Sequence, residues 1–157
     1  MQQFRAIFGV LVSHEVDFIV VGGMAGVLQG APITTQDIDI VYALSEDNQG
    51  RLLNALRELE ATFRADPRRL EPALSHLASR GHKLFTTKFG ALDCLVTIEE
   101  DTDYEDLASH IDRMQIGDFE LKVISLPRLI EVKEKLTRPK DQLALIQLRA
   151  TLDERGE

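Results

Sequence analysis

Two aspartates at close spacing are the first residues that could perform chemistry. Asp37-Ile38-Asp39 opens a segment in which polar and apolar residues alternate, and this alternation predicts a strand at about residues 37–42. Side chains at positions i and i+2 of a strand point to the same face about 7 Å apart. Carboxylate oxygens are the ligands that Mg²⁺ and Mn²⁺ prefer, and two such ions can clamp a phosphoryl group during its transfer. The alternative is a strand whose two aspartates only face solvent.

A glycine pair follows the apolar run at residues 18–21, which predicts a short buried strand. Glycines at the end of a strand let backbone amides approach phosphate oxygens, and the N-terminus of a following helix adds positive potential. No Gly-Lys-Ser/Thr follows, and the spacing of Gly22, Gly23 and Gly26 differs from the dinucleotide-binding fingerprint. A P-loop and a Rossmann motif are therefore excluded. A tight strand-to-helix turn without a ligand is the alternative.

Two other charged residues stand in apolar surroundings. Asp93 lies in a predicted strand at residues 91–98, where a charge is costly unless it is paired or coordinated. It is a candidate metal ligand or a base for an attacking hydroxyl, and the alternative is an aspartate facing solvent on an edge strand. Lys133 falls in the middle of the apolar stripe of a helix predicted after Ser125, which favours contact with a buried anion. The alternative for Lys133 is an aliphatic stem that extends to solvent.

Taken together, these residues resemble the nucleotidyltransferase superfamily that includes the DNA polymerase beta-like enzymes. The signature of that superfamily is a Gly-Gly or Gly-Ser pair followed, after about nine to thirteen residues, by Asp-x-Asp. Here thirteen residues, 24–36, separate the glycine pair from Asp37. The closer resemblance is to a small bacterial branch that contains the abortive-infection type IV toxin nucleotidyltransferases. The features shared with that branch are Thr35, Lys133 and the late motif Arg138-Pro139-Lys140-Asp141.

The resemblance implies an enzyme that moves a nucleoside monophosphate from a nucleoside triphosphate to an acceptor hydroxyl. It implies that Asp37, Asp39 and Asp93 are catalytic and hold two Mg²⁺ or Mn²⁺ ions. The residues that would bind the nucleotide are Gly22, Gly23, Thr35, Lys133, Lys140 and Asp141. The acceptor would be a small molecule, a tRNA end or a protein side chain. A toxin of this branch would also have an antitoxin as its partner.

The sequence departs from that family in three places. An arginine often found shortly before Thr35 is absent, Ala144 stands where a second acidic residue is expected, and Gly23 stands where many relatives have Ser. These changes affect the grip on phosphate and the acceptor chemistry, and they leave the metal carboxylates in place. The missing arginine and Ala144 favour a second hypothesis, in which the chain is a catalytically weak nucleotide-binding or regulatory module of the same fold. In a third hypothesis the chain is a structural domain and its Asp-x-Asp is coincidental.

The helices and strands that we expect along the chain indicate an α+β fold, in which a mixed β-sheet packs against helices and positions these residues. Helices are expected at 2–14, 24–28, 45–60, 73–79 and 104–110, after Ser125 and after Pro139, and strands at 18–21, 37–42, 83–88, 91–98, 113–116 and 119–124. Residues 61–72, with Arg64, Arg68 and Arg69, are expected to form a solvated loop. We expect one nucleotidyltransferase-like domain over residues 1–157, with a sheet core at 17–124 and a helical part at 125–157.

The composition of the chain excludes several classes of protein and of binding site. The 157 residues contain 18 basic and 26 acidic side chains, so the net charge is −8, which argues against a protein that coats nucleic acid. The single cysteine excludes an intrachain disulfide and a multi-cysteine zinc site. No apolar run reaches about 18 residues, and the first residues do not resemble a signal peptide. We therefore expect a soluble, cytoplasmic protein that does not bind membranes.

Overall fold

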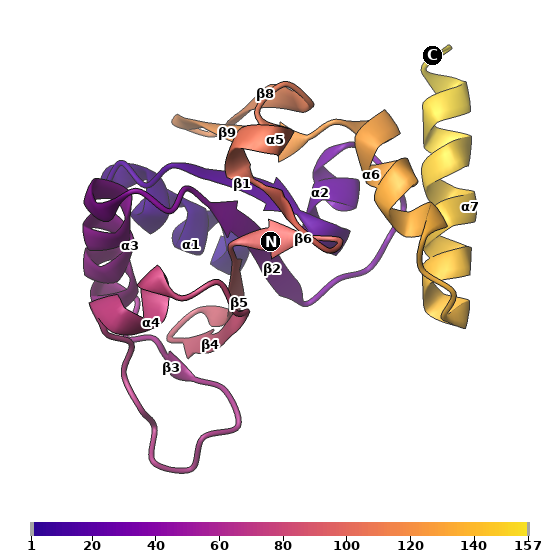
Figure 1. Ribbon diagram of the computed structural model, residues 1–157. Helices are drawn as coiled ribbons and strands as arrows, with labels where there is room; N and C mark the ends of the chain where they lie inside the picture. Colours follow the sequence, from indigo (N-terminus) through magenta and orange to yellow (C-terminus); the bar gives the residue numbers. More distant parts are fainter. Residues whose placement is uncertain (1, 157) are drawn as a thin grey trace.

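The computed structural model describes residues 2–156 and is built around a mixed sheet of seven strands (Figure 1). The strands of this sheet, in spatial order, are β3 (Thr62–Phe63), β4 (Lys83–Thr87), β5 (Gly90–Leu95), β2 (Asp37–Tyr42), β1 (Phe18–Val21), β9 (Phe119–Ile124) and β8 (Ile111–Ile116). A separate pair is formed by β6 (Thr97–Ile98) and β7 (Thr102–Asp103). Strand β2 is parallel to β5, and β1 is parallel to β9, while the other neighbours in the sheet are antiparallel.

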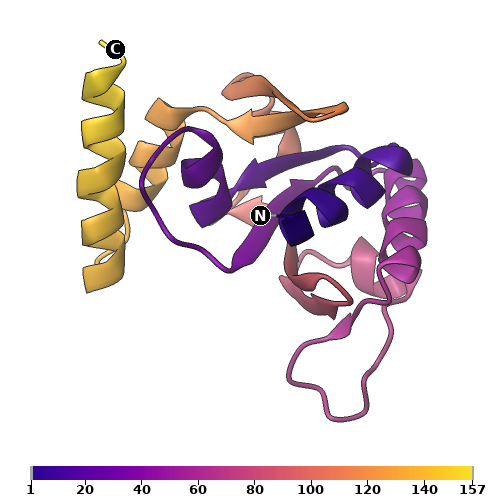
Figure 2. The ribbon, with the colours of Figure 1, turned by 180° about the vertical axis from the view of Figure 1, so that it is seen from behind.

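The helices surround this sheet on its faces and at one end. They are α1 (Gln2–Ser13), α2 (Gly22–Leu28), α3 (Glu46–Glu58), α4 (Leu74–Ala78), α5 (Tyr104–Leu107), α6 (Leu126–Glu134) and α7 (Pro139–Glu154). Seen from behind, α1 and α2 lie in front of the sheet (Figure 2). Helices α6 and α7 pack against each other at the end of the molecule beyond α2 (Figure 1).

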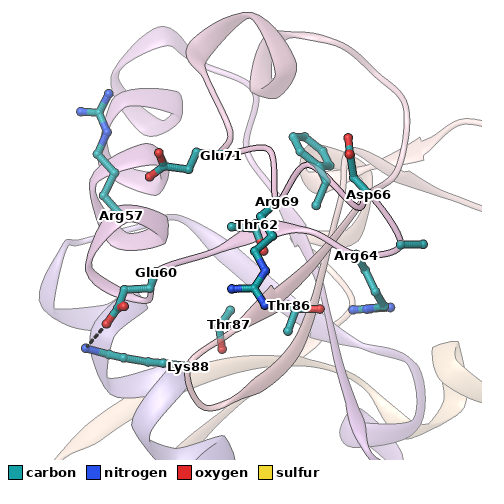
Figure 3. Close-up of a pocket in the computed structure, with 12 residues that line it drawn as sticks. Arg57, Glu60, Thr62, Arg64, Asp66, Arg69, Glu71, Thr86, Thr87 and Lys88 are labelled. Carbon is teal, nitrogen blue, oxygen red and sulfur yellow. Dashed lines mark ion pairs between the residues drawn. The ribbon is translucent and has the colours of Figure 1, made fainter.

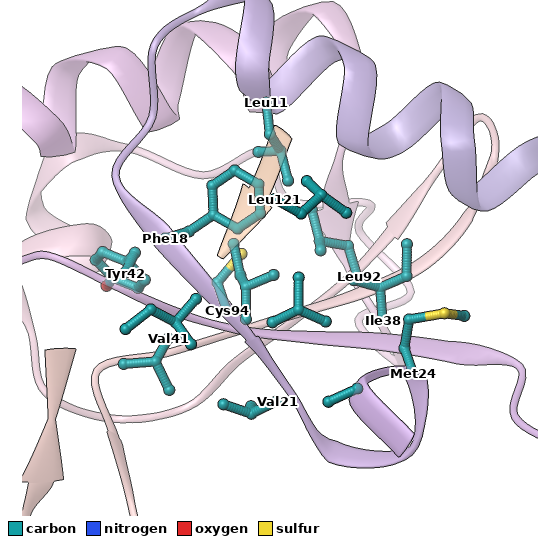
Figure 4. Close-up of a cluster of buried hydrophobic side chains, with 14 of the residues drawn as sticks. Leu11, Phe18, Val21, Met24, Ile38, Val41, Tyr42, Leu92, Cys94 and Leu121 are labelled. Atoms are coloured by element: carbon teal, nitrogen blue, oxygen red, sulfur yellow. The ribbon is translucent and has the colours of Figure 1, made fainter. Parts of the chain in front are cut away.

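The core forms because one face of the central strands is apolar. Ile38 and Ile40 of β2 are fully buried, and so are Leu92 and Cys94 of β5, which lie opposite them in the parallel register. Figure 4 shows Ile38, Leu92 and Cys94 gathered with side chains from β1, α1 and α2. Because side chains alternate along a strand, Asp37, Asp39 and Asp93 are forced onto the opposite face.

Close packing at α2 brings the helical end of the molecule against the sheet. Gly26 is buried, and a Cβ atom there would come within 2.7 Å of Ile33 Cδ1 and 3.3 Å of Leu148 Cδ2. A side chain at this position would therefore press on Ile33 and, through Leu148, on α7. Leu129 of α6 and Leu145 of α7 are buried in the same region. This packing places residues of α6 and α7 beside the glycine pair that follows β1.

The predicted mixed α+β fold is confirmed, and three local predictions were wrong. The expected loop at 61–72 contains the short strand β3, which pairs with β4 at the edge of the sheet but is too short to show a period in the sequence. The expected strand at 91–98 is divided, because β5 ends at Leu95 and β6 pairs with β7 instead. The expected helix at 104–110 ends at Leu107, and the hairpin begins at Ile111, where pairing with β9 starts.

Within the described residues, no helix is long and apolar enough to cross a membrane. The division of the chain into a sheet core and a C-terminal helical part stays a prediction.

Candidate active site

Two of the three predicted carboxylates lie directly beside each other. Asp39 of β2 is paired in register with Asp93 of β5, so both side chains project from the same face of the sheet. Asp37 lies two residues before Asp39, is exposed, and is paired with Ala91. The open face of the sheet thus brings together acidic residues that are more than fifty positions apart in the sequence.

Asp39 lies in an environment that favours its neutral form. Its pKa is raised to about 7, first by burial and then by repulsion from Asp93, a hydrogen bond with Asp93 and repulsion from Asp37, while Lys133 acts in the opposite direction. The Oδ1 atom of Asp39 is buried and has no hydrogen-bond partner among the described residues. A buried carboxylate oxygen without a partner is costly unless a proton or a cation satisfies it.

The glycine pair lies against this carboxylate. Gly22 has φ +68°, and a Cβ atom there would stand 2.4 Å from Asp39 Oδ2, so neither the backbone conformation nor the space suits another residue. A Cβ atom on Gly23 would stand 3.0 Å from the hydroxyl oxygen of Thr35. That hydroxyl donates a hydrogen bond to the backbone oxygen of Asp37 at 3.3 Å. The pair therefore provides an approach to Asp39 that side chains would close.

Lys133, from α6, contacts a buried carboxylate of α7. Its Nζ atom lies 3.2 Å from Asp141 Oδ1, and Asp141 is completely buried. The Nε atom of Arg138 donates to Asp141 Oδ2 at 2.6 Å. Hydrogen bonds from Arg138 and then Lys133 hold the pKa of Asp141 below its ordinary value. The side chain of Lys133 therefore points inward and pairs with the buried carboxylate of Asp141. It does not extend to solvent, as the alternative had it.

A cavity of about 280 Å³ connects these groups. Its lining includes the sequence-predicted residues Gly22, Gly23, Thr35, Asp37, Asp39, Lys133, Lys140 and Asp141, together with Arg138 and Ala144. Lys140 is exposed and has no ion-pair partner among the described residues. Asp93 does not line this cavity and lies behind Asp39. The fold therefore brings eight of the nine predicted site residues to one cavity.

Arg64 was expected on a solvated loop, and that prediction was wrong. Its Nη2 atom lies 2.6 Å from Asp93 Oδ1 and also donates to the backbone oxygen of Phe85 at 2.6 Å. The backbone amide of Arg64 donates to Leu84, which is the residue of β4 paired with Asp93. Only the pairing of β3, β4 and β5 brings Arg64 to the carboxylates, and no pattern in the sequence indicated it. Arg138 also lines the candidate site, and in the sequence it was identified only as part of the late motif and not as a site residue.

The carboxylates themselves show how far the site suits a divalent cation. Asp37 and Asp39 offer oxygen donors, and the unpartnered Oδ1 atom of Asp39 is the kind of group that a cation satisfies. The Oδ1 atom of Asp93 already forms an ion pair with Arg64. Among residues 2–156, no three acidic, histidine or cysteine side chains are gathered as a group that could hold a metal ion. The oxygen donors open to a cation are therefore those of Asp37 and Asp39, two carboxylates and not three.

The sequence of this chain matches no protein-family model and no curated protein. Its fold is similar to solved structures over nearly its whole length. The lincosamide antibiotic adenylyltransferase LnuA, solved with lincomycin bound, has a TM-score of 0.68 and 12% identity, and the match covers 96% of this chain and 97% of LnuA. The proposed nucleotidyltransferase TM1012 from Thermotoga maritima has a TM-score of 0.58 and 20% identity, with 96% and 91% covered.

A third similar structure is the antibiotic-resistance factor ANT(2'')-Ia, with a TM-score of 0.61, 14% identity, and coverage of 96% of this chain and 83% of that one. At these identities the likeness shows the fold alone. The chain therefore has the nucleotidyltransferase fold that its motifs resembled.

Proposed function

We propose that this protein is a metal-dependent nucleotidyltransferase that moves a nucleoside monophosphate from a nucleoside triphosphate to an acceptor hydroxyl. The observation that supports it most is the pairing of Asp39 with Asp93 beside Gly22, because this arrangement joins three distant parts of the sequence at one point. Among the similar solved structures, LnuA is an adenylyltransferase and TM1012 is a proposed nucleotidyltransferase, which supports the same class of reaction.

The lining of the cavity suggests how the triphosphate would lie. Gly22 and Gly23 leave room for phosphate oxygens to approach the backbone, and Thr35 stands beside them. Lys133 of α6 and Lys140 of α7 supply positive charge to the same cavity, with Asp141 holding Lys133 in place. Asp37 and Asp39 would hold the divalent ions, and Asp93 would complete the set. When bound, the ions would offset negative charge on the attacking and leaving oxygens.

The transfer would be an in-line displacement. The acceptor oxygen forms a bond to the α-phosphorus, and the bond from that phosphorus to the oxygen that bridges it to the β-phosphorus breaks. Pyrophosphate leaves with the electron pair of that bond. The proton of the acceptor hydroxyl passes to a carboxylate, for which Asp93 is suited because it lies beside Asp39 on the open face of the sheet.

A transfer assay tests the proposal. The protein is incubated with each labelled nucleoside triphosphate, Mg²⁺ or Mn²⁺ and a cell extract, and we expect a labelled acceptor to appear. Asp39→Ala should abolish the label, because it removes the carboxylate nearest the glycine pair. Asp118→Ala, in the exposed turn of the β8–β9 hairpin, is the matched control and should leave the label unchanged. Label that survives Asp39→Ala would contradict the proposal.

Two observations favour a second candidate, a catalytically weak module that binds nucleotides and regulates a partner. Arg64 already occupies an oxygen of Asp93, and Ala144 lines the cavity where the family pattern has a second acidic residue. Binding of triphosphates without turnover of any of them would support this module. A toxin role with an antitoxin partner, and a cytoplasmic location, rest on the sequence resemblance and stay predictions.

A further inference from the structure

A second and larger cavity lies on the other side of the carboxylates. It has a volume of about 660 Å³ and lies between the C-terminal end of α3, the segment that follows β3, and the β3–β4 edge of the sheet. Figure 3 shows Arg69 near its middle, beside Thr86 and Thr87. Ligand pockets for small molecules have volumes of roughly 300–1,000 Å³, so the cavity is large enough for one.

The strand register connects this cavity to the candidate active site. Thr62 is paired with Thr86, Thr86 with Ala91, and Ala91 with Asp37, so these four residues form one row across the open face. Neighbouring strands are about 4.8 Å apart, which puts Thr86 roughly 10 Å from Asp37 along the row. Ala91 lies between them, and its small side chain leaves space above the sheet for a ligand. A small molecule anchored at the threonines could therefore extend to the carboxylates.

The ion pair between Arg64 and Asp93 also connects the larger cavity to the candidate active site. Arg64 lines the larger cavity, and its guanidinium group holds Asp93, the neighbour of Asp39. Asp39 in turn lines the smaller cavity with the glycine pair. The carboxylates thus stand between two cavities, as a transfer between a donor nucleotide and an acceptor requires.

The charges of the larger cavity favour an anion. Lys88 pairs with Glu60 at 3.6 Å, and Asp66 pairs with Arg68 at 2.9 Å, so these charges are compensated. The lining charges without an ion-pair partner among residues 2–156 are those of Arg57, Arg69 and Glu71, which leaves one positive charge in excess. The side chains of Thr62 and Thr86 also make no hydrogen bond among those residues. A guanidinium and two free hydroxyls are donors that suit an oxyanion.

We propose that the larger cavity is the acceptor pocket and that the acceptor is a small hydroxyl compound bearing an oxyanion, either a phosphate or a carboxylate. This inference rests on the proposed function and adds the chemical class of its second substrate. Arg69, Thr62 and Thr86 bind the oxyanion, and the hydroxyl group lies toward Asp93.

Binding of simple ions to the full-length protein tests the pocket directly. Inorganic phosphate, acetate and choline are titrated at constant ionic strength, and the backbone amide resonances are followed by NMR. We expect phosphate or acetate to shift the resonances of Thr62, Arg69 and Thr86, with choline shifting none of them. The stronger of the two anions identifies the oxyanion. Arg69→Gln should weaken binding about tenfold, because it removes a charge-assisted hydrogen bond.

Arg80→Gln is the matched control for that variant. Arg80 has the same charge, is exposed, does not line the larger cavity, and forms no ion pair among residues 2–156, so its loss leaves the charges of the cavity unchanged. It should change anion binding less than twofold. Equal effects of the two variants, tighter binding of choline, or no shift with either anion would overturn the inference. Binding of a short RNA oligonucleotide in the absence of anion binding would overturn it as well.

A titration with ATP and Mg²⁺ in the same sample separates this inference from the proposed function. Shifts at Gly22, Asp39 and Lys133 without any anion binding at Arg69 would overturn the acceptor pocket alone. Anion binding at Arg69 without those shifts would overturn the proposed function, and the acceptor role with it. Both sets of shifts should be followed by faster transfer to glycerol 3-phosphate or glycerate than to glycerol, and Arg69→Gln should remove that preference.

Discussion

Asp39 links the chemistry of the site to the stability of the protein. Its pKa is raised to about 7 by burial first and by Asp93 and Asp37 next, whereas an aspartate in an unfolded chain titrates near 3.8. Between these two values the folded protein holds a proton that the unfolded chain has lost. Stability from this group is therefore fully present below about pH 4 and is lost as the pH rises through about 7.

We predict that Asp39→Asn removes this pH dependence. In metal-free buffer the variant should be more stable than the wild type at pH 8 by about 2 kcal/mol, because the buried charge is absent. At pH 4 the two proteins should be nearly equal. Urea unfolding at both pH values measures the difference. A wild-type protein whose stability does not fall between pH 4 and pH 8 would contradict the prediction.

Gly22 is the residue whose replacement should damage the site most directly. We predict that Gly22→Ala destabilises the protein by about 1–2 kcal/mol, because the residue has a positive φ, and that it displaces Asp39, whose Oδ2 would lie 2.4 Å from the new atom. Gly81→Ala is the control, since nothing lies within 4 Å of a Cβ atom there and its φ is not positive. Thermal unfolding and nucleotide binding measure both effects. Equal losses in the two variants would contradict the role of Gly22.

At the scale of elements, α6 is held by an ion-pair network separate from the site. Glu99 follows β6 and accepts hydrogen bonds from Arg128 Nη2 at 2.5 Å and from Thr102 at 3.0 Å, and it also pairs with Lys135. The side chains of Glu99 and Arg128 are only 11% and 14% exposed, so the network is shielded from solvent. Hydrogen bonds, first from Arg128 and then from Lys135 and Thr102, outweigh burial and lower the pKa of Glu99 to about 2. This network fixes the helix that carries Lys133.

We predict that Glu99→Gln weakens the attachment of α6 and lowers stability at pH 7 by about 2 kcal/mol, because Arg128 loses its partner. In the wild type, the contribution of Glu99 is present above about pH 4.5 and is lost as the pH falls toward 2, so the variant and the wild type should converge in acid. Glu131→Gln is the control, because Glu131 is 62% exposed and lies 3.8 Å from Arg128. Urea unfolding at pH 7 and pH 3 decides the outcome. A constant difference would contradict it.

At the scale of the whole molecule, a strongly acidic chain presents a local group of cations. The net charge is −8, yet Lys133, Arg138 and Lys140 all line the cavity that contains Asp37 and Asp39. The carboxylates of this cavity repel a free triphosphate, and a divalent ion reverses that repulsion. Nucleotide and metal should therefore bind together and stabilise the folded protein together.

We predict that ATP with Mg²⁺ raises the melting temperature of the wild type, whereas ATP with a chelator does not. A ligand at one hundred times its dissociation constant adds about 2.7 kcal/mol of stability. Asp39→Asn should lose most of this gain, because it removes a carboxylate ligand, and Asp118→Asn should retain it. The comparison is made by differential scanning calorimetry. An equal rise in the presence of the chelator would contradict a metal-dependent site.

The strands and the candidate carboxylates could be predicted from the sequence because their signals are local. Alternation along residues 37–42 places Ile38 and Ile40 in the core and Asp37 and Asp39 on the other face, whatever strand comes next. The glycine pair and the inward position of Lys133 are equally local, since each follows from the period of one element. For this reason the α+β class and most element positions agree with the structure.

The order of strands in the sheet could not be derived in the same way, because pairing depends on contacts between distant segments. The neighbours Asp39 and Asp93 belong to parallel strands, and Arg64 reaches Asp93 only because β3 and β4 complete that edge of the sheet. The larger cavity arises from this same pairing. The residue types that could bind a metal and phosphates are therefore determined by the sequence alone, whereas the tertiary structure decides which carboxylate Arg64 neutralises and where the larger cavity opens.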